Sequence, residues 1–134
     1  MHCTGCWAAE YGHKLNLDLE TIDSIIRQGK ELGVYMYIYT GGEPTVRKKD
    51  LIKLCEMHPD CEFLSFSNGT LSMRNSVMKF LRVKNFVPAF SLEGSEEAND
   101  GRRGRGNLSE GYACNETVEG QRSSIWRFPP AIQA

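Results

Sequence analysis

The chain has 134 residues and a formal net charge of −1, so it is long enough for one domain but well short of the roughly 250 residues of a complete eight-stranded α/β barrel. The near-neutral charge argues against a nucleic-acid-binding surface, although the run GRRGRG at 101–106 is locally basic. No apolar run approaches the roughly 18 residues that cross a membrane and no signal-peptide pattern opens the chain, so we expect a cytoplasmic protein with no nucleic-acid or membrane partner.

Two cysteines, Cys3 and Cys6, open the chain in a C-x-x-C arrangement. With Cys55, Cys61 and Cys114 the total is odd, which fits a disulfide framework poorly and reduced thiols well. Taken alone, the opening pair is consistent with a metal site, with exposed thiols or with a thioredoxin-like redox motif, although a redox motif needs a preceding strand. We expect Cys55 to be a core residue on its helix and Cys114 to be an incidental thiol in the tail.

A helix and a strand are the first regular elements that the sequence predicts. Residues 17–33 combine a capping Asp18, an apolar stripe and a terminating Gly33, which predicts a helix. Residues 34–40, VYMYIYT, are β-branched and aromatic without any charge, which predicts a strand that is covered on both faces.

The same order of helix and strand then repeats twice. Residues 48–58 and 71–83 predict helices, and residues 61–67 and 85–94 predict strands, with Pro88 unfavourable in the first half of the last strand. Successive units of this kind form a parallel sheet with right-handed crossovers, so the carboxyl ends of all three strands should lie on one side of the sheet.

Each predicted strand ends in a polar segment that contains glycine. The segments are GGEP at 41–44, NGT at 68–70 and SLEG at 91–94. Ligands of such sheets bind outside the carboxyl ends of the strands, so these three segments predict a binding site.

The last part of the chain does not continue the repeat. Residues 107–134 show no clear helical stripe and contain Pro129-Pro130. We therefore predict a domain at 1–106, followed by an irregular or disordered tail at 107–134.

The segments CTGCWAAEYG, YIYTGGEP and SLEG, the last followed by RRG, together resemble the radical S-adenosylmethionine (radical SAM) enzymes over residues 1 to about 106. This resemblance implies an α/β fold that is a partial (β/α) barrel, with about three parallel strands that each follow a helix. It also implies two cofactors, a [4Fe-4S] cluster and S-adenosylmethionine (SAM). In the family, the cluster reduces SAM to generate a 5′-deoxyadenosyl radical.

The resemblance also implies roles for single residues. Family members carry C-x-x-x-C-x-x-C, so Cys3 and Cys6 correspond to the second and third cluster ligands, and the first would fall two positions before Met1. The family usually has an aromatic residue where Gly5 stands here. The implied SAM contacts are Gly41, Gly42 and Glu43 for the amino group, Ser91 or Glu93 for the ribose or the carboxylate, and Asn68.

These implications lead to an expected function with open alternatives. We expect part of a radical SAM enzyme that is inactive as an isolated chain, because the first cluster cysteine and half of the barrel are missing. The alternatives are a degenerate, non-catalytic fragment that binds a metal or a partner, and a C-x-x-C thiol redox protein. An open parallel sheet leaves unpaired edges and uncovered apolar faces, so we also expect self-association or a complementing chain. The substrate is not indicated.

Overall fold

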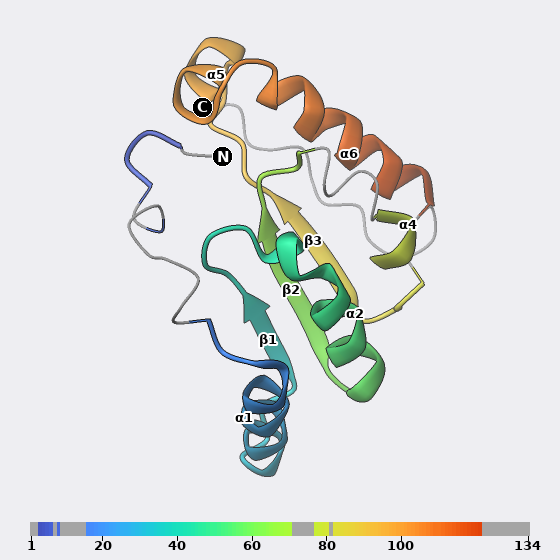
Figure 1. The fold of residues 1–134 in the computed structure, drawn as a ribbon. Helices are drawn as coiled ribbons and strands as arrows, with labels where there is room; N and C mark the ends of the chain where they lie inside the picture. Colours follow the sequence, from blue (N-terminus) through green and yellow to red (C-terminus); the bar gives the residue numbers. More distant parts are fainter. Residues whose placement is uncertain (1–2, 7, 9–15, 71–76, 81, 122–134) are drawn as a thin grey trace.

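The computed structural model describes residues 3–6, 8, 16–70, 77–80 and 82–121, and this part of the chain contains a parallel three-stranded sheet in the order β1-β2-β3. The strands are β1 (Met36–Tyr39), β2 (Glu62–Ser67) and β3 (Phe86–Phe90). The helices are α1 (Leu19–Glu31), η3 (Pro44–Arg47), α2 (Lys48–Met57), α4 (Val77–Phe80), α5 (Glu96–Arg103) and α6 (Asn107–Gln121). Each strand follows a helix, as Figure 1 shows, which confirms the predicted α/β fold and its likeness to a partial barrel.

Helix α1 begins and ends where the sequence predicts. The Asp18 carboxylate accepts a hydrogen bond from Thr21 N at 2.7 Å, which satisfies one of the free N–H groups of the first turn. Gly33 has a φ of +82°, a conformation that favours glycine and stops the helix. No helix in the described ranges is long and apolar enough to span a membrane.

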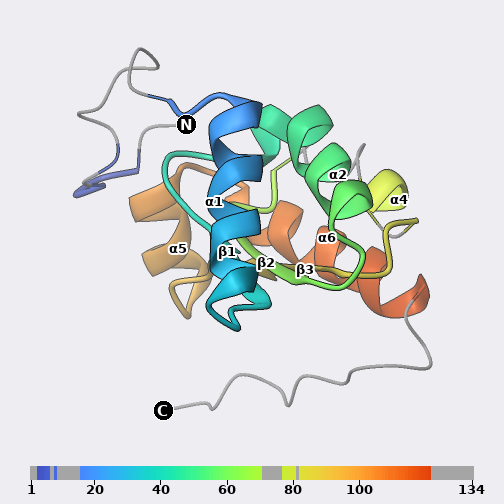
Figure 2. The ribbon, with the colours of Figure 1, turned by 90° about the horizontal axis from the view of Figure 1, so that it is seen from below.

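The helices cover one face of the sheet. Side chains from α1, α2, α4 and α6 meet the strands in a single buried cluster, whose fully buried members are Ile26, Leu51, Leu54, Cys55, Cys61, Phe63, Phe80, Phe86 and Cys114. The ring of Phe63 stacks on Tyr39 with 5.4 Å between the centroids. Seen along the sheet in Figure 2, α1, α2 and α4 lie on the same side of the strands.

The other face of the sheet is apolar and has no helix over it within the described residues. Met36 and Ile38 of β1 are 60% and 54% exposed, and Phe66 of β2 is 47% exposed. The prediction that residues 34–40 are covered on both faces is therefore wrong. An uncharged strand shows that both faces are apolar, but whether both are covered depends on elements elsewhere in the fold. The uncovered face that we expected for an open sheet is confirmed.

Pro88 lies within β3, opposite Ser65 of β2. Asn85 O accepts from Phe63 N, and Ser91 N donates to Ser67 O, so the odd-numbered backbone groups of β3 face β2. The nitrogen of Pro88 therefore faces away from β2, where a donor is not needed. Proline is tolerated here because β3 is an edge strand of the described sheet.

The prediction of an irregular segment at 107–134 is wrong for residues 107–121, which form helix α6. The buried residues of α6 whose side chains are described are Asn107, Gly111 and Cys114, and these form no stripe of large apolar side chains. Cys114 is thus a core residue and not an incidental thiol. Residues 122–134, like residues 71–76 and 81 of the predicted third helix, lie outside the described residues.

Candidate functional site

The Glu43 carboxylate joins the end of β1 to the end of β2. Its Oε1 accepts from Thr45 N at 3.2 Å, from Thr45 Oγ1 at 2.5 Å and from Ser67 Oγ at 3.0 Å. Its Oε2 accepts from Asn68 N at 2.9 Å. Both hydroxyl donors belong to buried residues, so this carboxylate satisfies polar groups that water does not reach.

The two glycines before Glu43 leave their backbone open. Gly41 has a φ of +130°, which favours glycine, and no atom lies within 4 Å of where a Cβ on Gly41 or Gly42 would stand. The space is therefore not filled by neighbouring side chains. A ligand could approach the peptide groups of this turn directly.

A chain of side-chain amides joins the end of β2 to the end of β3. Asn107 Nδ2 donates to Asn68 O at 3.2 Å, and Asn99 Nδ2 donates to Asn107 Oδ1 at 3.2 Å. Glu93 N then donates to Asn99 Oδ1 at 3.1 Å. Because Asn99 is fully buried, these bonds fix the two strand ends relative to α5 and α6.

Asn68 and Ser91 follow the last residues of two neighbouring strands. Ser91 N donates to Ser67 O at 2.9 Å, which continues the β2-β3 ladder beyond the strands. The Asn68 side chain accepts from Thr70 N at 2.9 Å and closes a local turn, the common use of asparagine after a strand.

The Glu93 carboxylate accepts hydrogen bonds from two arginines. Arg102 Nη1 donates to Glu93 Oε1 at 2.7 Å, and Arg103 Nε donates to the same oxygen at 2.9 Å. These bonds, first that from Arg103, hold the pKa of Glu93 below its usual value. Their contribution to stability is therefore present above the ordinary glutamate pKa and is lost as the pH falls through the lowered one.

Residues Cys3–Cys6 form a turn, which we call the cysteine turn. Cys6 N donates to Cys3 O at 3.1 Å, and Gly5 has a φ of +71°. That conformation favours glycine, whereas the motif that the sequence resembles usually has an aromatic residue at this position. Thr4 N donates to Arg102 O at 2.9 Å, so the cysteine turn lies against the end of α5, as Figure 1 shows.

We call the three strand ends, residues 40–43, 68–70 and 91–94, the rim. The bonds described above form one continuous path along the rim to the cysteine turn, through Glu43, Asn68, Asn107, Asn99, Glu93, Arg102 and Thr4. The residues that the sequence singled out thus lie at the same end of the sheet. Within the described residues, no hydrogen bond joins the cysteine turn directly to the turn at Gly41 and Gly42.

A comparison with protein families matches the model of the radical SAM superfamily to residues 1–113. The chain belongs to the radical SAM superfamily. The match extends into α6, beyond the limit near residue 106 that the sequence motifs indicated. No curated protein matches the chain.

The cysteine turn offers two ligands for the iron-sulfur cluster that the superfamily uses. Cys3 and Cys6 are half-buried thiols, and thiolates are the ligands of such clusters. However, the described residues contain no group of three or more His, Cys, Asp or Glu side chains that could hold a metal ion. The described residues therefore fit two cluster ligands and do not complete the set.

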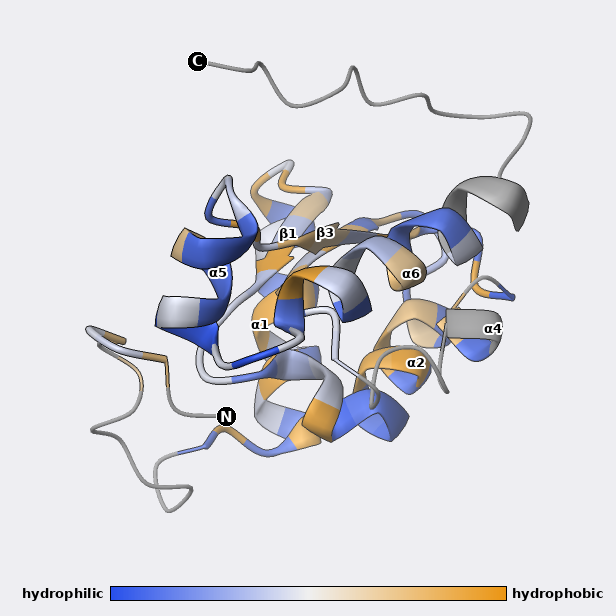
Figure 3. Cartoon of the chain, turned by 90° about the horizontal axis from the view of Figure 1, so that it is seen from above, coloured by the Kyte–Doolittle hydropathy of each residue, from blue (hydrophilic) through white to orange (hydrophobic). Residues whose placement is uncertain are grey.

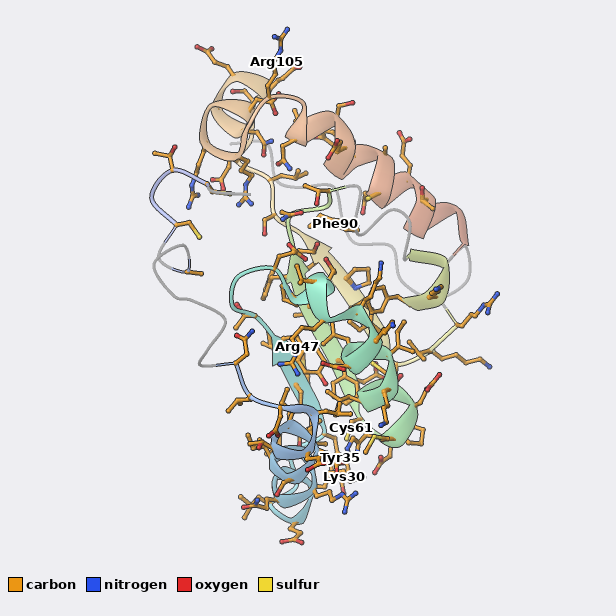
Figure 4. The ribbon with its side chains drawn as sticks, viewed as in Figure 1. Lys30, Tyr35, Arg47, Cys61, Phe90 and Arg105 are labelled. Atoms are coloured by element: carbon orange, nitrogen blue, oxygen red, sulfur yellow. The ribbon has the colours of Figure 1, made fainter. Side chains whose placement is uncertain are left out.

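The three remaining cysteines do not supply the missing ligand. Cys55, Cys61 and Cys114 are each 1% exposed in the core. Burial raises the pKa of Cys55 to about 12 and also raises that of Cys61, which keeps both thiols protonated. Figure 4 shows Cys61 near Lys30 and Tyr35, at the opposite end of the sheet from the rim.

This placement predicts the reactivity of the five thiols. Brief treatment of the native, reduced chain with iodoacetamide should modify Cys3 and Cys6 and leave the three buried cysteines unmodified. After unfolding in urea, all five should react. Mass spectrometry of peptides measures the result, and rapid modification of Cys114 in the native chain would contradict the burial of α6.

Several residues that bond to the rim were not anticipated from the sequence. Ser67 and Asn107 bond to residues 24 and 39 positions away, and Asn99 bonds to Glu93 and Asn107 from within a helix that no apolar stripe marks, so no local pattern indicates these partners. Helix α5 did carry a local signal, with Ser95 as its N-cap, acidic residues in its first turn and basic residues in its last. Figure 3 shows α5 as hydrophilic over most of its length, so it lacks the apolar stripe by which the helices at 17–33, 48–58 and 71–83 were predicted.

Proposed function

We propose that this chain carries the part of a radical SAM site that binds SAM at the rim and supplies Cys3 and Cys6 to a [4Fe-4S] cluster. The observation that supports the proposal is the hydrogen-bonded path from Glu43 to Thr4, which attaches the cysteine turn to the strand ends. The cluster and SAM have to be adjacent in such an enzyme, and a shared rim would satisfy that requirement.

The rim residues have distinct roles in this proposal. The open backbone of Gly41 and Gly42 binds the amino group of SAM, while Glu43 holds the shape of that turn and contributes Oε2, which accepts a single bond from the described chain. Ser91 lies where it can bind the ribose or the carboxylate. Glu93 Oε1 accepts from two arginines, so Glu93 Oε2 is the oxygen that can accept from a hydroxyl of the ligand. The side-chain amide of Asn68 is already used, because it closes a turn with Thr70 N. Asn68 therefore helps to shape the rim, and its side chain is a weaker candidate for a direct SAM contact.

The 134 residues alone should not cleave SAM. Within the described residues, two thiolates leave the ligand set of the cluster incomplete, and Met36 and Ile38 of the apolar face are exposed. Cluster binding would require a third ligand, and the apolar face would require a covering segment. Both would come from outside the described residues, for example from a complementing chain or a second copy at the open edges of the sheet. The alternative is a metal- or partner-binding module without catalysis, which the incomplete ligand set also favours.

Supplying the missing thiol tests this proposal. The chain is extended by Cys-Asn directly before Met1, which places a cysteine four residues before Cys3, and an Ala-Asn extension is the matched control. Both are reconstituted anaerobically with iron and sulfide, and iron content, visible absorption and SAM cleavage are measured. We expect the broad visible absorption of an iron-sulfur cluster, and an iron content of about one [4Fe-4S] cluster per chain, only with the cysteine extension.

Equal iron content and absorption in the two extended chains would refute the cluster proposal. Zinc uptake by the original chain without an iron-sulfur band in either extension would support the metal-binding module instead. Disulfide exchange by Cys3 and Cys6 would support a redox protein.

A further inference from the structure

Within the described residues, the hydrogen bonds from the cysteine turn to other elements all involve one residue, Arg102. Thr4 N donates to Arg102 O at 2.9 Å, and Arg102 Nε donates to Thr4 O at 3.3 Å. Thr4 and Arg102 are 98 residues apart in sequence. Because Thr4 lies between Cys3 and Cys6, bonds on both its N–H and its C=O restrict the orientation of the whole turn.

The position of Arg102 at the end of α5 explains both bonds. The last carbonyls of a helix have no partner within the helix, so Arg102 O is available to accept from Thr4 N. Cations are also favoured at a helix C-terminus, which suits the adjacent guanidinium groups of Arg102 and Arg103. The cysteine turn thus completes the C-terminus of α5 in the way that a capping residue would.

The Arg102 side chain is itself fixed by the end of β3. Its Nη1 donates to Glu93 Oε1 at 2.7 Å, and Arg103 binds the same oxygen. The backbone of Glu93 is bonded in turn to Asn99, which is fully buried. An exposed ion pair alone contributes little, but a carboxylate shared by two arginines and anchored to a buried amide forms a network.

We propose that Arg102 is a positioning residue that fastens the cysteine turn to the rim, with Glu93 setting the orientation of its guanidinium. A ligand that binds at Glu93 would then affect the two thiols, and metal at the thiols would affect Glu93. The attachment itself does not depend on the proposed function. Only its consequence for cluster binding rests on that function.

Amide exchange and thiol alkylation test the attachment in the chain as it exists. The variants are Arg102→Ala, Arg102→Lys and Glu93→Ala, and the control is Arg105→Ala, because Arg105 points away from the molecule in Figure 4. We expect Arg102→Ala to speed both the exchange of Thr4 N–H and the alkylation of Cys3 and Cys6 by roughly five- to tenfold, the effect of about one hydrogen bond. Glu93→Ala should give a smaller increase, and Arg105→Ala none.

The lysine variant separates positioning from folding. Lysine retains the charge beside Glu93, but its single ammonium cannot bind Glu93 and Thr4 O in the same geometry, so the turn should loosen while exchange in β2 stays slow. Unchanged exchange and alkylation in Arg102→Lys, or equal changes in Arg105→Ala, would overturn the proposal. If the Arg102→Ala chain does not fold, the exchange and alkylation rates of the Arg102→Lys chain decide the proposal.

Iron content after anaerobic reconstitution gives a further readout. With the Cys-Asn extension, the Arg102→Lys chain should retain less iron than the Arg102 chain, and equal retention would count against a positioning role. Failure of every extended chain to bind iron would refute the proposed function, whereas the exchange and alkylation results would still decide whether Arg102 fastens the turn.

Discussion

Replacement of Glu43 by alanine is expected to lower the free energy of unfolding by about 3 kcal/mol, because hydrogen bonds to a charged group contribute roughly 1.5–3 kcal/mol and buried donors are left unpaired. The loss would affect four donor groups, on Thr45, Ser67 and Asn68. Thr45 is 1% exposed and Ser67 is 2% exposed, so water cannot readily replace the carboxylate. Urea unfolding followed by far-ultraviolet circular dichroism measures the change.

Glu43→Gln sharpens this prediction. The amide oxygen of glutamine can keep the bonds at one position, but its NH₂ group would then face the donor Asn68 N, so we expect a loss of about 2 kcal/mol. Glu56→Gln, at an exposed position of α2, is the matched control and should change stability by less than about 0.5 kcal/mol. A Glu43→Gln chain as stable as the control would show that the carboxylate does not hold the two strand ends together.

The features that the sequence predicted well are those that depend on residues close together in the chain. Asp18 and Gly33 mark the start and the end of α1 through local interactions within one or two turns. The three strands were predicted from short apolar runs. The location of the rim also followed, because parallel strands place all their carboxyl ends on one side. The family match over residues 1–113 agrees with the motifs on which the resemblance depended.

The features that the sequence did not predict depend on distant partners. Arg102 was visible only as part of a basic run, whereas its role at the cysteine turn depends on Thr4, 98 residues away. The apolar residues Met36 and Ile38 give the same sequence pattern whether or not another element covers their face of the strand. Helix α6 was missed because the buried residues described in it, Asn107, Gly111 and Cys114, form no apolar stripe. Gly111 packs closely only because a glycine stands opposite it, just after β2.

That glycine is Gly69, and its replacement by alanine should separate α6 from the sheet. A Cβ on Gly69 would stand 3.0 Å from Gly111 Cα and 3.3 Å from Phe90 Cδ1, and its φ of +69° disfavours any side chain. The left-handed conformation costs roughly 1–2 kcal/mol in a residue with a Cβ, and overpacking adds about 1–2 kcal/mol. We therefore expect Gly69→Ala to lower the free energy of unfolding by about 2–4 kcal/mol in urea titrations.

Gly33→Ala is the control that isolates the close approach to α6. Gly33 has a similar φ of +82°, but no atom lies within 4 Å of where its Cβ would stand, so only the conformational cost of about 1–2 kcal/mol applies. The difference between the two variants measures the contact between Gly69 and Gly111. Gly69→Ala should also speed the alkylation of Cys114 in the native chain, which Gly33→Ala should not do. Equal destabilisation by both variants, with Cys114 still protected, would mean that α6 does not rest on Gly69.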